Sequence, residues 1–233
     1  MSRELIETCI NQAISYLQQG KPKEARSLLT ELHRALPAHT DILFLLGAAS
    51  SMMGERTDAI RQYDQLLGIA PDFLPALNAK GLDLATLGRK DEALAIFDRA
   101  LQVAPQFMDA ILNKAALLNE LGRYQEVSTL LKAHEKIEHP HVQVNVGVAA
   151  FNLGDYAKAE RCAQIALKAT PQDPATLGLM GAILLKQKKL HQALDYCRKA
   201  IAANPNDISA SNSIAAIYSC LLYTSDAADD LLC

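Results

Sequence analysis

A 34-residue period runs through most of this 233-residue chain and limits what it can fold into. The period appears when the sequence is divided at a recurring turn position, which gives six comparable segments that begin at Gly20, Gly54, Gly88, Gly122, Gly154 and Lys188. The interval between successive starts is constant, except that Gly154 follows Gly122 two positions early. A repeat of this length is one supersecondary unit that cannot bury its apolar face alone, so successive units must stack on one another.

Each segment has the pattern of a helical hairpin. The glycine lies between two amphipathic stretches, where a residue that accepts a positive φ ends one helix and permits a tight turn. A small residue that lets two helices approach closely follows five positions later, at Ala25, Ala59, Ala93, Ala159 and Ala193, with Val127 in the fourth segment. The first helix of each pair has its own small residue, at Gly47, Gly81, Ala115, Gly147, Gly181 or Ala215. Prolines, which cannot continue a helix, close five segments at Pro37, Pro71, Pro105, Pro171 and Pro205.

The composition agrees with an all-α fold and disfavours several functional classes. Half of the residues are apolar, only 5% are aromatic and Trp is absent, which disfavours a β-sandwich. The net charge of -3 is small and shows no basic cluster, so we expect neither nucleic acid nor a membrane as partner. No secretory signal and no membrane-spanning apolar run is visible, which predicts a cytoplasmic protein. The five scattered cysteines predict reduced thiols rather than disulfides or a zinc site.

Together these features resemble the tetratricopeptide repeat. The resemblance rests on the Leu-x-x-x-Gly pattern of Leu43 to Gly47, the turn glycine, the alanine five residues later, an aromatic residue such as Tyr63 or Phe97, and the closing proline. It implies an all-α, right-handed superhelical solenoid of antiparallel helix hairpins. The expected repeats cover residues 6–39, 40–73, 74–107, 108–139, 140–173 and 174–207, with the first helix of a seventh at 208–219. The fourth repeat is irregular, with Val127, His134 and His139 at consensus positions.

The segment from Cys220 onward departs from the repeat. It begins CLLYTSDAAD, which resembles a translated transposon-end sequencing adapter. We therefore interpret residues 220–233 as a non-native tail and assign the repeat array to residues 1–219. On this interpretation the natural protein continues past Ser219.

One cluster invites a metal or catalytic interpretation. It consists of His134, Glu135, Glu138, His139 and His141. A zincin motif needs a second histidine four residues after the first, and Glu138 stands there instead. The alternative is a helix end at the short repeat, with Pro140 starting the next helix. No nucleophile motif or phosphate-binding loop is visible, so we predict no catalytic residue, no metal ligand and no cofactor.

The family resemblance implies that the first helices of the hairpins line a concave surface. The residues expected to face inward form a largely apolar set that we predict as a partner-binding groove: Ile10, Ile14, Leu17, Phe44, Met52, Asn78, Leu82, Leu112, Asn119, Val144, Val148, Phe151, Leu185 and Lys186. The basic clamp of chaperone-binding members is missing, because Ile14, Phe44, Ala48 and Asn78 occupy the inner positions. The asparagine ladder of members joined to glycosyltransferases is only partial, at Asn11, Asn113 and Asn145.

Two functions remain open at this point. The first is a non-enzymatic scaffold that binds a protein or peptide in an apolar groove. The second is the substrate-recruiting N-terminal arm of a larger glycosyl-, sulfo- or methyltransferase. The sequence beyond Ser219 would distinguish them.

Overall fold

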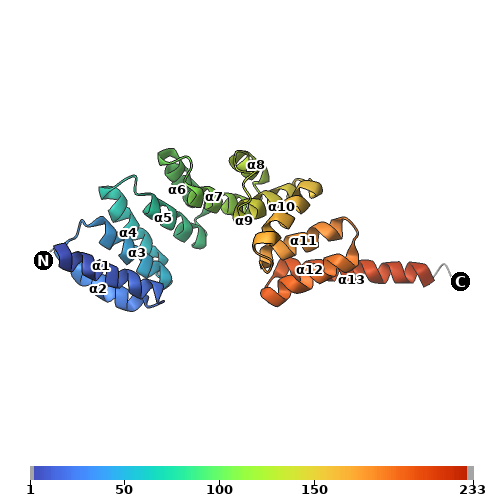
Figure 1. Ribbon diagram of the computed structural model, residues 1–233, viewed down its shortest axis with the longest axis horizontal. Coiled ribbons are helices and arrows are strands. Elements are labelled where there is room, and N and C mark those ends of the chain that lie inside the picture. Colours follow the sequence, from blue (N-terminus) through green and yellow to red (C-terminus); the bar gives the residue numbers. More distant parts are fainter. Residues whose placement is uncertain (1–2, 230–233) are drawn as a thin grey trace. The chain divides into compact units, whose positions relative to one another are not determined.

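The computed structural model of the chain is all-helical. It describes residues 3–229, with side chains up to Leu222, and these residues form 13 helices and no strand (Figure 1). The helices are α1 (Arg3–Gln18), α2 (Pro22–Ala35), α3 (Thr40–Met52), α4 (Arg56–Ile69), α5 (Leu74–Thr86), α6 (Lys90–Val103), α7 (Met108–Glu120), α8 (Tyr124–Leu131), α9 (Pro140–Asn152), α10 (Tyr156–Ala169), α11 (Pro174–Lys186), α12 (Leu190–Ala203) and α13 (Ile208–Asp229). The all-α class expected from the period is confirmed. None of the described helices is both long and apolar enough to cross a membrane.

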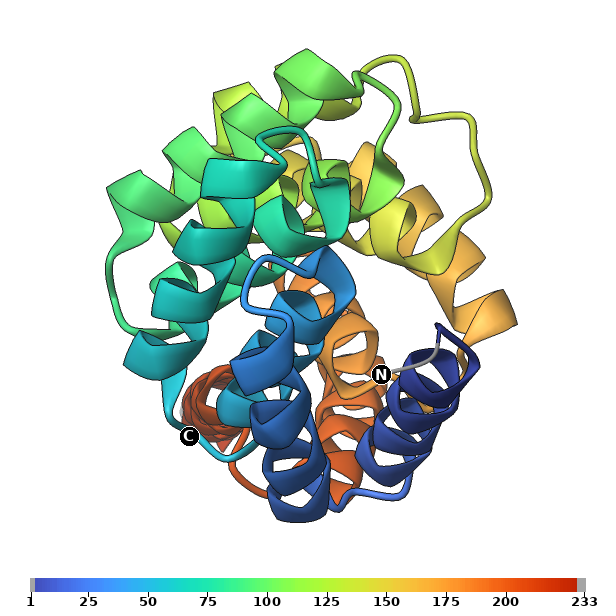
Figure 2. The ribbon, with the colours of Figure 1, turned by 90° about the vertical axis from the view of Figure 1, so that its left-hand side faces the viewer.

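Successive helices pair into hairpins, and the chain divides into two compact units, Met1–Leu117 and Leu118–Cys233. The helices follow one another as hairpins in both views of the ribbon (Figures 1 and 2). Within the first unit the first helices of neighbouring hairpins touch, α1 against α3 and α3 against α5. Within the second unit α9 touches α11 and α11 touches α13, whereas α10 and α12 make no such contact in the described part of the chain. The first helices therefore form an inner layer in each unit, and the second helices form an outer layer.

The turn glycines have the backbone conformation that the repeat predicts. Gly54 and Gly154, for example, have φ values of +81° and +87°, in the left-handed region that glycine accepts without strain. The sixth turn has Lys188 instead, with φ +59°. It is the one non-glycine residue in this region among the described residues.

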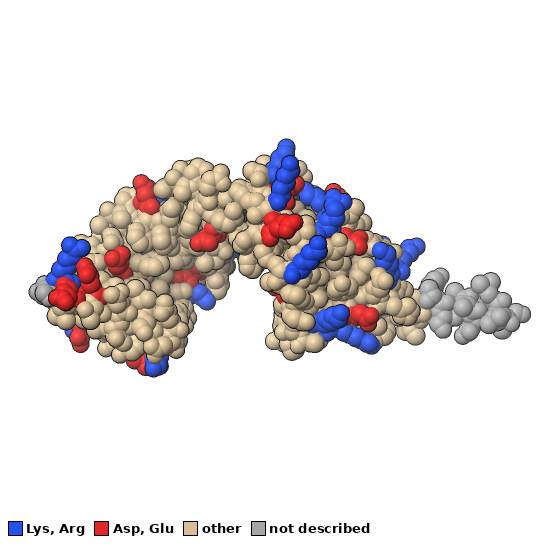
Figure 3. All heavy atoms as spheres, viewed as in Figure 1, with Lys and Arg blue, Asp and Glu red and all other residues tan. Residues whose placement is uncertain are grey.

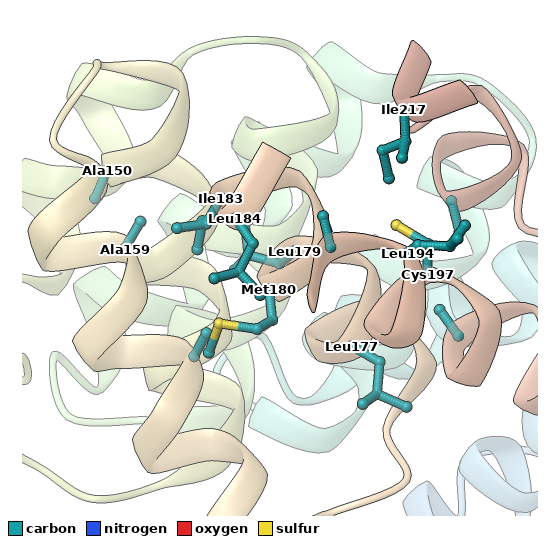
Figure 4. Packing of buried hydrophobic residues seen from close by; sticks show 14 residues of the cluster. Ala150, Ala159, Leu177, Leu179, Met180, Ile183, Leu184, Leu194, Cys197 and Ile217 are labelled. Carbon is teal, nitrogen blue, oxygen red and sulfur yellow. The ribbon is translucent and has the colours of Figure 1, made fainter. Parts of the chain in front are cut away.

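The small residues are where neighbouring helices come closest. The alanine that follows each turn glycine by five positions is fully buried, as is Val127 in the fourth repeat. A Cβ atom on Gly81 of α5 would lie 2.5 Å from the ring of Phe97 in α6, so only glycine leaves room for that ring. In the second unit, Met180, Ile183 and Leu184 of α11 are buried together with residues of α9, α10 and α12 (Figure 4).

Two segments differ from the expected repeat. Helix α8 has 8 residues, whereas the other second helices have 14. At the other end, α13 runs on from Ile208 to Asp229, beyond the helix expected at 208–219. Leu221 of the expected tail packs against the core of the second unit. Residues 230–233 of that tail lie outside the described residues.

Candidate binding surface

The residues of the predicted groove all lie on first helices, and none of them is fully buried. In the first unit they come from α1, α3, α5 and α7, and in the second unit from α7, α9 and α11. Four are exposed, namely Ile14, Met52, Leu82 and Lys186. The others are half-buried, at Ile10, Leu17, Phe44, Asn78, Leu112, Asn119, Val144, Val148, Phe151 and Leu185.

An apolar row crosses the inner layer of the first unit. Ile14, Ala48 and Leu82 occupy the same repeat position on α1, α3 and α5, and these helices contact one another in that order. Ile14 is 36% exposed and Leu82 is 43% exposed, while the methyl group of Ala48 between them is half-buried. We call Ile14, Ala48 and Leu82 the inner row. It has no charged side chain, so it offers apolar area to a partner.

The two phenylalanines of the predicted groove take part in side-chain packing. The ring centroid of Phe44 lies 5.6 Å from that of Phe73 and 6.1 Å from that of Tyr63. The ring of Phe151 lies 5.5 Å from the ring of Tyr156. Phe44 also packs against the core of the first unit, together with Ile10 and Leu17. Phe151 packs against the core of the second unit, together with Val148 and Leu185. These six residues therefore stabilise contacts between helices, in addition to the partner binding predicted for them.

The inner asparagines bind one another between successive repeats. Asn113 Nδ2 donates to Asn78 Oδ1 at 2.9 Å. Asn119 Nδ2 donates to the backbone oxygen and to Oδ1 of Asn145, both at 3.1 Å. The two asparagines of the predicted groove are thus each joined to the following repeat. In the expected ladder, Asn113 and Asn145 occupy the same position of successive repeats. Each bonds instead to an asparagine at a different position of the preceding repeat, so the ladder does not form one continuous row.

A buried polar network near the inner layer was not foreseen from the sequence. Asp83 of α5 is 2% exposed, and its Oδ1 accepts from Arg56 at 2.6 Å and from Ser51 Oγ at 2.7 Å. These contacts join α3, α4 and α5. Burial, with the charge of Asp83 adding to it, raises the pKa of Tyr63. A signal existed in the sequence, since the repeat position of Asp83 is filled elsewhere by Ala49, Leu117, Ala149 and Ile183.

The histidine cluster does not form a metal site in the described part of the chain, which contains no group of three or more His, Cys, Asp or Glu side chains that could hold a metal ion. His134 is buried at a core position, and His139 immediately precedes α9. Glu135 forms an ion pair with Lys158 at 2.7 Å. His134 and Glu135 therefore serve packing and ion pairing in the connection that follows α8.

The described cysteines are free thiols. Cys162 and Cys197 are buried, Cys9 is half-buried and Cys220 is exposed. Burial raises the pKa of the Cys162 and Cys197 thiols, which keeps them protonated and unreactive.

Comparison with known proteins identifies the family of this architecture. Two family models, both described as tetratricopeptide repeat, match residues 16–80 and residues 78–126 and 147–208. A comparison with curated proteins found no match.

Solved structures with the same fold are similar over most of the chain. The type IV pilus biogenesis factor PilW superimposes with a TM-score of 0.75 at 18% identity, covering 91% of this chain and 99% of that one. PilF of Pseudomonas aeruginosa gives 0.76 at 17% identity, covering 88% and 95%. YrrB, described as having an unusual peptide-binding site, gives 0.61 at 16% identity, covering 79% and 96%. At these identities the similarity shows the fold alone.

Proposed function

Because the chain belongs to the tetratricopeptide repeat family, a family of protein-interaction scaffolds, we propose that it binds an apolar peptide or partner helix on the inner layer of its first unit. The observation that carries this proposal is the inner row. Ile14 and Leu82 expose large parts of their side chains on either side of Ala48, on three helices that contact one another. A partner side chain placed over Ala48 touches both neighbours and removes apolar area from water.

The energy available sets the expected affinity. Full burial of a leucine or isoleucine side chain contributes about 1.5–3 kcal/mol, and association has to offset the loss of translational and rotational freedom. Two or three such contacts give about 3–9 kcal/mol before that cost, so we expect binding no tighter than about micromolar, which corresponds to about -8 kcal/mol. Since the inner row has no charge, this affinity depends weakly on salt.

Peptides selected from a random display library against the full chain provide the probe. Leu82→Ala should weaken binding of the selected peptide about fivefold or more, since it removes apolar contact area. Ala48→Glu should abolish binding, because it places a charge in the apolar contact. Ile69→Ala is the matched control, since Ile69 of α4 is 49% exposed but lies on a second helix. It should bind the peptide like the parent.

Thermal unfolding of each variant shows whether the fold is intact. Phe44→Ala and Phe151→Ala are expected to weaken binding and to lower the melting temperature, because both rings also pack internally. If Leu82→Ala and Ala48→Glu bind normally while Ile69→Ala does not, or if affinity collapses with salt, the inner row is not the binding surface.

A further inference from the structure

The basic residues of the two units are compensated very differently. In the first unit most of them are held in ion pairs, at Arg3, Arg26, Arg56, Arg61, Lys80, Arg89 and Lys114. In the second unit, nine described basic residues form no ion pair, and all nine are exposed: Lys132, Lys136, Arg161, Lys168, Lys186, Lys188, Lys189, Arg198 and Lys199. The small net charge of the chain therefore conceals an uneven distribution.

Most of the acidic residues with described side chains in the second unit are engaged inside it. Glu126 pairs with Arg123, and Glu135 pairs with Lys158. Glu160 accepts from Gln187 at 2.6 Å. The side chains of Asp155, Asp173 and Asp207 accept from backbone N–H groups at the starts of α10, α11 and α13, where the helix dipole compensates their charge. Glu138 and Asp195 are exposed and form no ion pair, so the nine unpaired basic residues still outnumber the unpaired acidic ones among the described side chains.

Six of these basic residues lie on second helices of the second unit or in the connection that follows one of them. Arg161 and Lys168 lie two turns apart on α10, Lys132 and Lys136 follow α8, and Arg198 and Lys199 lie on α12. We call these six residues the outer basic surface. Figure 3 shows basic side chains spread over the second unit. Arg198 donates to the hydroxyl of Tyr218, and Lys199 lies 5.3 Å from the ring centroid of Tyr196, but both partners are neutral.

We propose that the outer basic surface binds an acidic, Asp- and Glu-rich segment of another protein. Charge complementarity carries the proposal, since six exposed positive charges on α10, on α12 and in the connection after α8 attract a chain of negative ones. Four of the six are lysines, which act as flexible point charges and do not require one fixed anion geometry. This surface is separate from the inner row and does not depend on the function proposed there.

The surface is poorly suited to the other polyanions. Tyr196 is half-buried beside Lys199, and Tyr218, which accepts from Arg198, is 44% exposed. One exposed ring does not provide the row of stacking surfaces that binds successive bases. A peripheral membrane helix needs an apolar face that enters the bilayer. Among the described residues, α10 and α12 expose no large apolar side chain.

The test uses the full chain and a fluorescent dodecapeptide of alternating Glu and Ser. The parent should bind it, and raising the salt from about 50 mM to about 200 mM should weaken binding about tenfold, because exposed charges are screened. The triple variant Lys132→Gln, Arg161→Gln, Lys168→Gln should bind about tenfold more weakly. A charge-preserving triple variant, Lys132→Arg, Arg161→Lys, Lys168→Arg, should bind like the parent.

The control removes three positive charges elsewhere. Lys21, Lys23 and Arg34 of the first unit are exposed and form no ion pair within the described chain, so changing all three to Gln alters the net charge equally. This control should bind the peptide within about twofold of the parent, because the three charges that it removes lie outside the outer basic surface. The proposal is refuted if the two triple glutamine variants weaken peptide binding equally. It is also refuted if a peptide of alternating Gln and Ser binds the parent as tightly as the Glu-Ser peptide does.

Two further measurements examine the identity of the partner. Tighter binding to duplex DNA, or to phosphatidylserine vesicles, than to the acidic peptide would overturn the assignment to an acidic protein segment. The parent is also tested for self-association. If it self-associates in a salt-sensitive way, and the triple glutamine variant at Lys132, Arg161 and Lys168 does not, the surface binds a second copy of this chain. That result would also overturn the assignment to an acidic segment of another protein.

Discussion

At the scale of single residues, backbone conformation at the turns decides how easily each hairpin closes. Five turns use glycine in the left-handed region, and the sixth uses Lys188 in the same region. A side chain with a Cβ atom is strained there by about 1 kcal/mol. Lys188 therefore holds a conformation that the repeat normally assigns to glycine.

Lys188→Gly should stabilise the protein by about 1 kcal/mol, because it removes that strain. The reverse experiment is available at Gly154, where nothing lies within 4 Å of an added Cβ and only the φ of +87° opposes it. Gly154→Ala should destabilise by about 1 kcal/mol. Urea unfolding measures both changes, and a destabilising Lys188→Gly would show that the lysine side chain contributes more than its strain costs.

Gly81 is required for a second reason, which is space. Gly81→Ala should destabilise by about 1–3 kcal/mol through overlap with Phe97, and this exceeds the gain in helix propensity of about 1 kcal/mol. Gly68→Ala is the control, since Gly68 lies in α4 and an added Cβ meets nothing within 4 Å. It should stabilise the protein. Chemical denaturation measures the free energy of unfolding of both variants. If Gly81→Ala and Gly68→Ala change it in the same direction, the packing argument is contradicted.

At the scale of elements, the fourth hairpin shows how a repeat absorbs a deletion. The spacing between Gly122 and Gly154 is two residues short, yet α8 is six residues shorter than the other second helices. It ends at Leu131, and residues 132–139 form a longer connection to α9. Gln143 of α9 holds this connection in place. Its Nε2 donates to the backbone oxygens of Glu135 and Ile137 at 2.9 and 2.8 Å, and the residue is 2% exposed.

Gln143→Leu should destabilise the protein by about 1–3 kcal/mol, since it leaves two carbonyl groups without their donor. Asn152→Leu is the matched control, because Asn152 is exposed and bonds only to the backbone of its own helix. Its effect should stay within about 0.5 kcal/mol. Equal melting temperatures for the two variants would mean that the connection does not need Gln143.

At the scale of the whole molecule, stability is expected to be local. Contacts in the described residues join helices that are adjacent or next but one in the chain. In such a repeat protein each hairpin depends on its neighbours rather than on one common core. Damage in one unit should therefore leave the other unit folded.

Hydrogen exchange tests this expectation with two equivalent substitutions. Gly81→Ala should accelerate exchange in α3–α6 and leave α11–α13 unchanged. Gly181→Ala, whose Cβ would overlap Cys197, should do the reverse. If either substitution accelerates exchange equally in both regions, the chain unfolds as one cooperative block.

The candidate surface was only partly predictable. The repeat position identified residues of the inner layer, because the period places equivalent residues on equivalent helix faces. It did not show that Phe44 contacts Phe73, the residue before α5, or that Asn78 accepts from Asn113. It marked Asp83 as a charged residue at an otherwise apolar repeat position, but it did not identify Arg56 as the partner that lets this residue be buried.

The sequence by itself determined the hairpins, the turns and the buried alanines. These features depend on residues close together in the chain, where glycine, proline and helical periodicity act locally. The tertiary structure alone decided the pairing of Asp83 with Arg56, the closure of the fourth repeat by Gln143 and the uncompensated charge of the outer basic surface. Each of these depends on which side chains meet across stacked helices, and contact geometry rather than local preference sets that outcome.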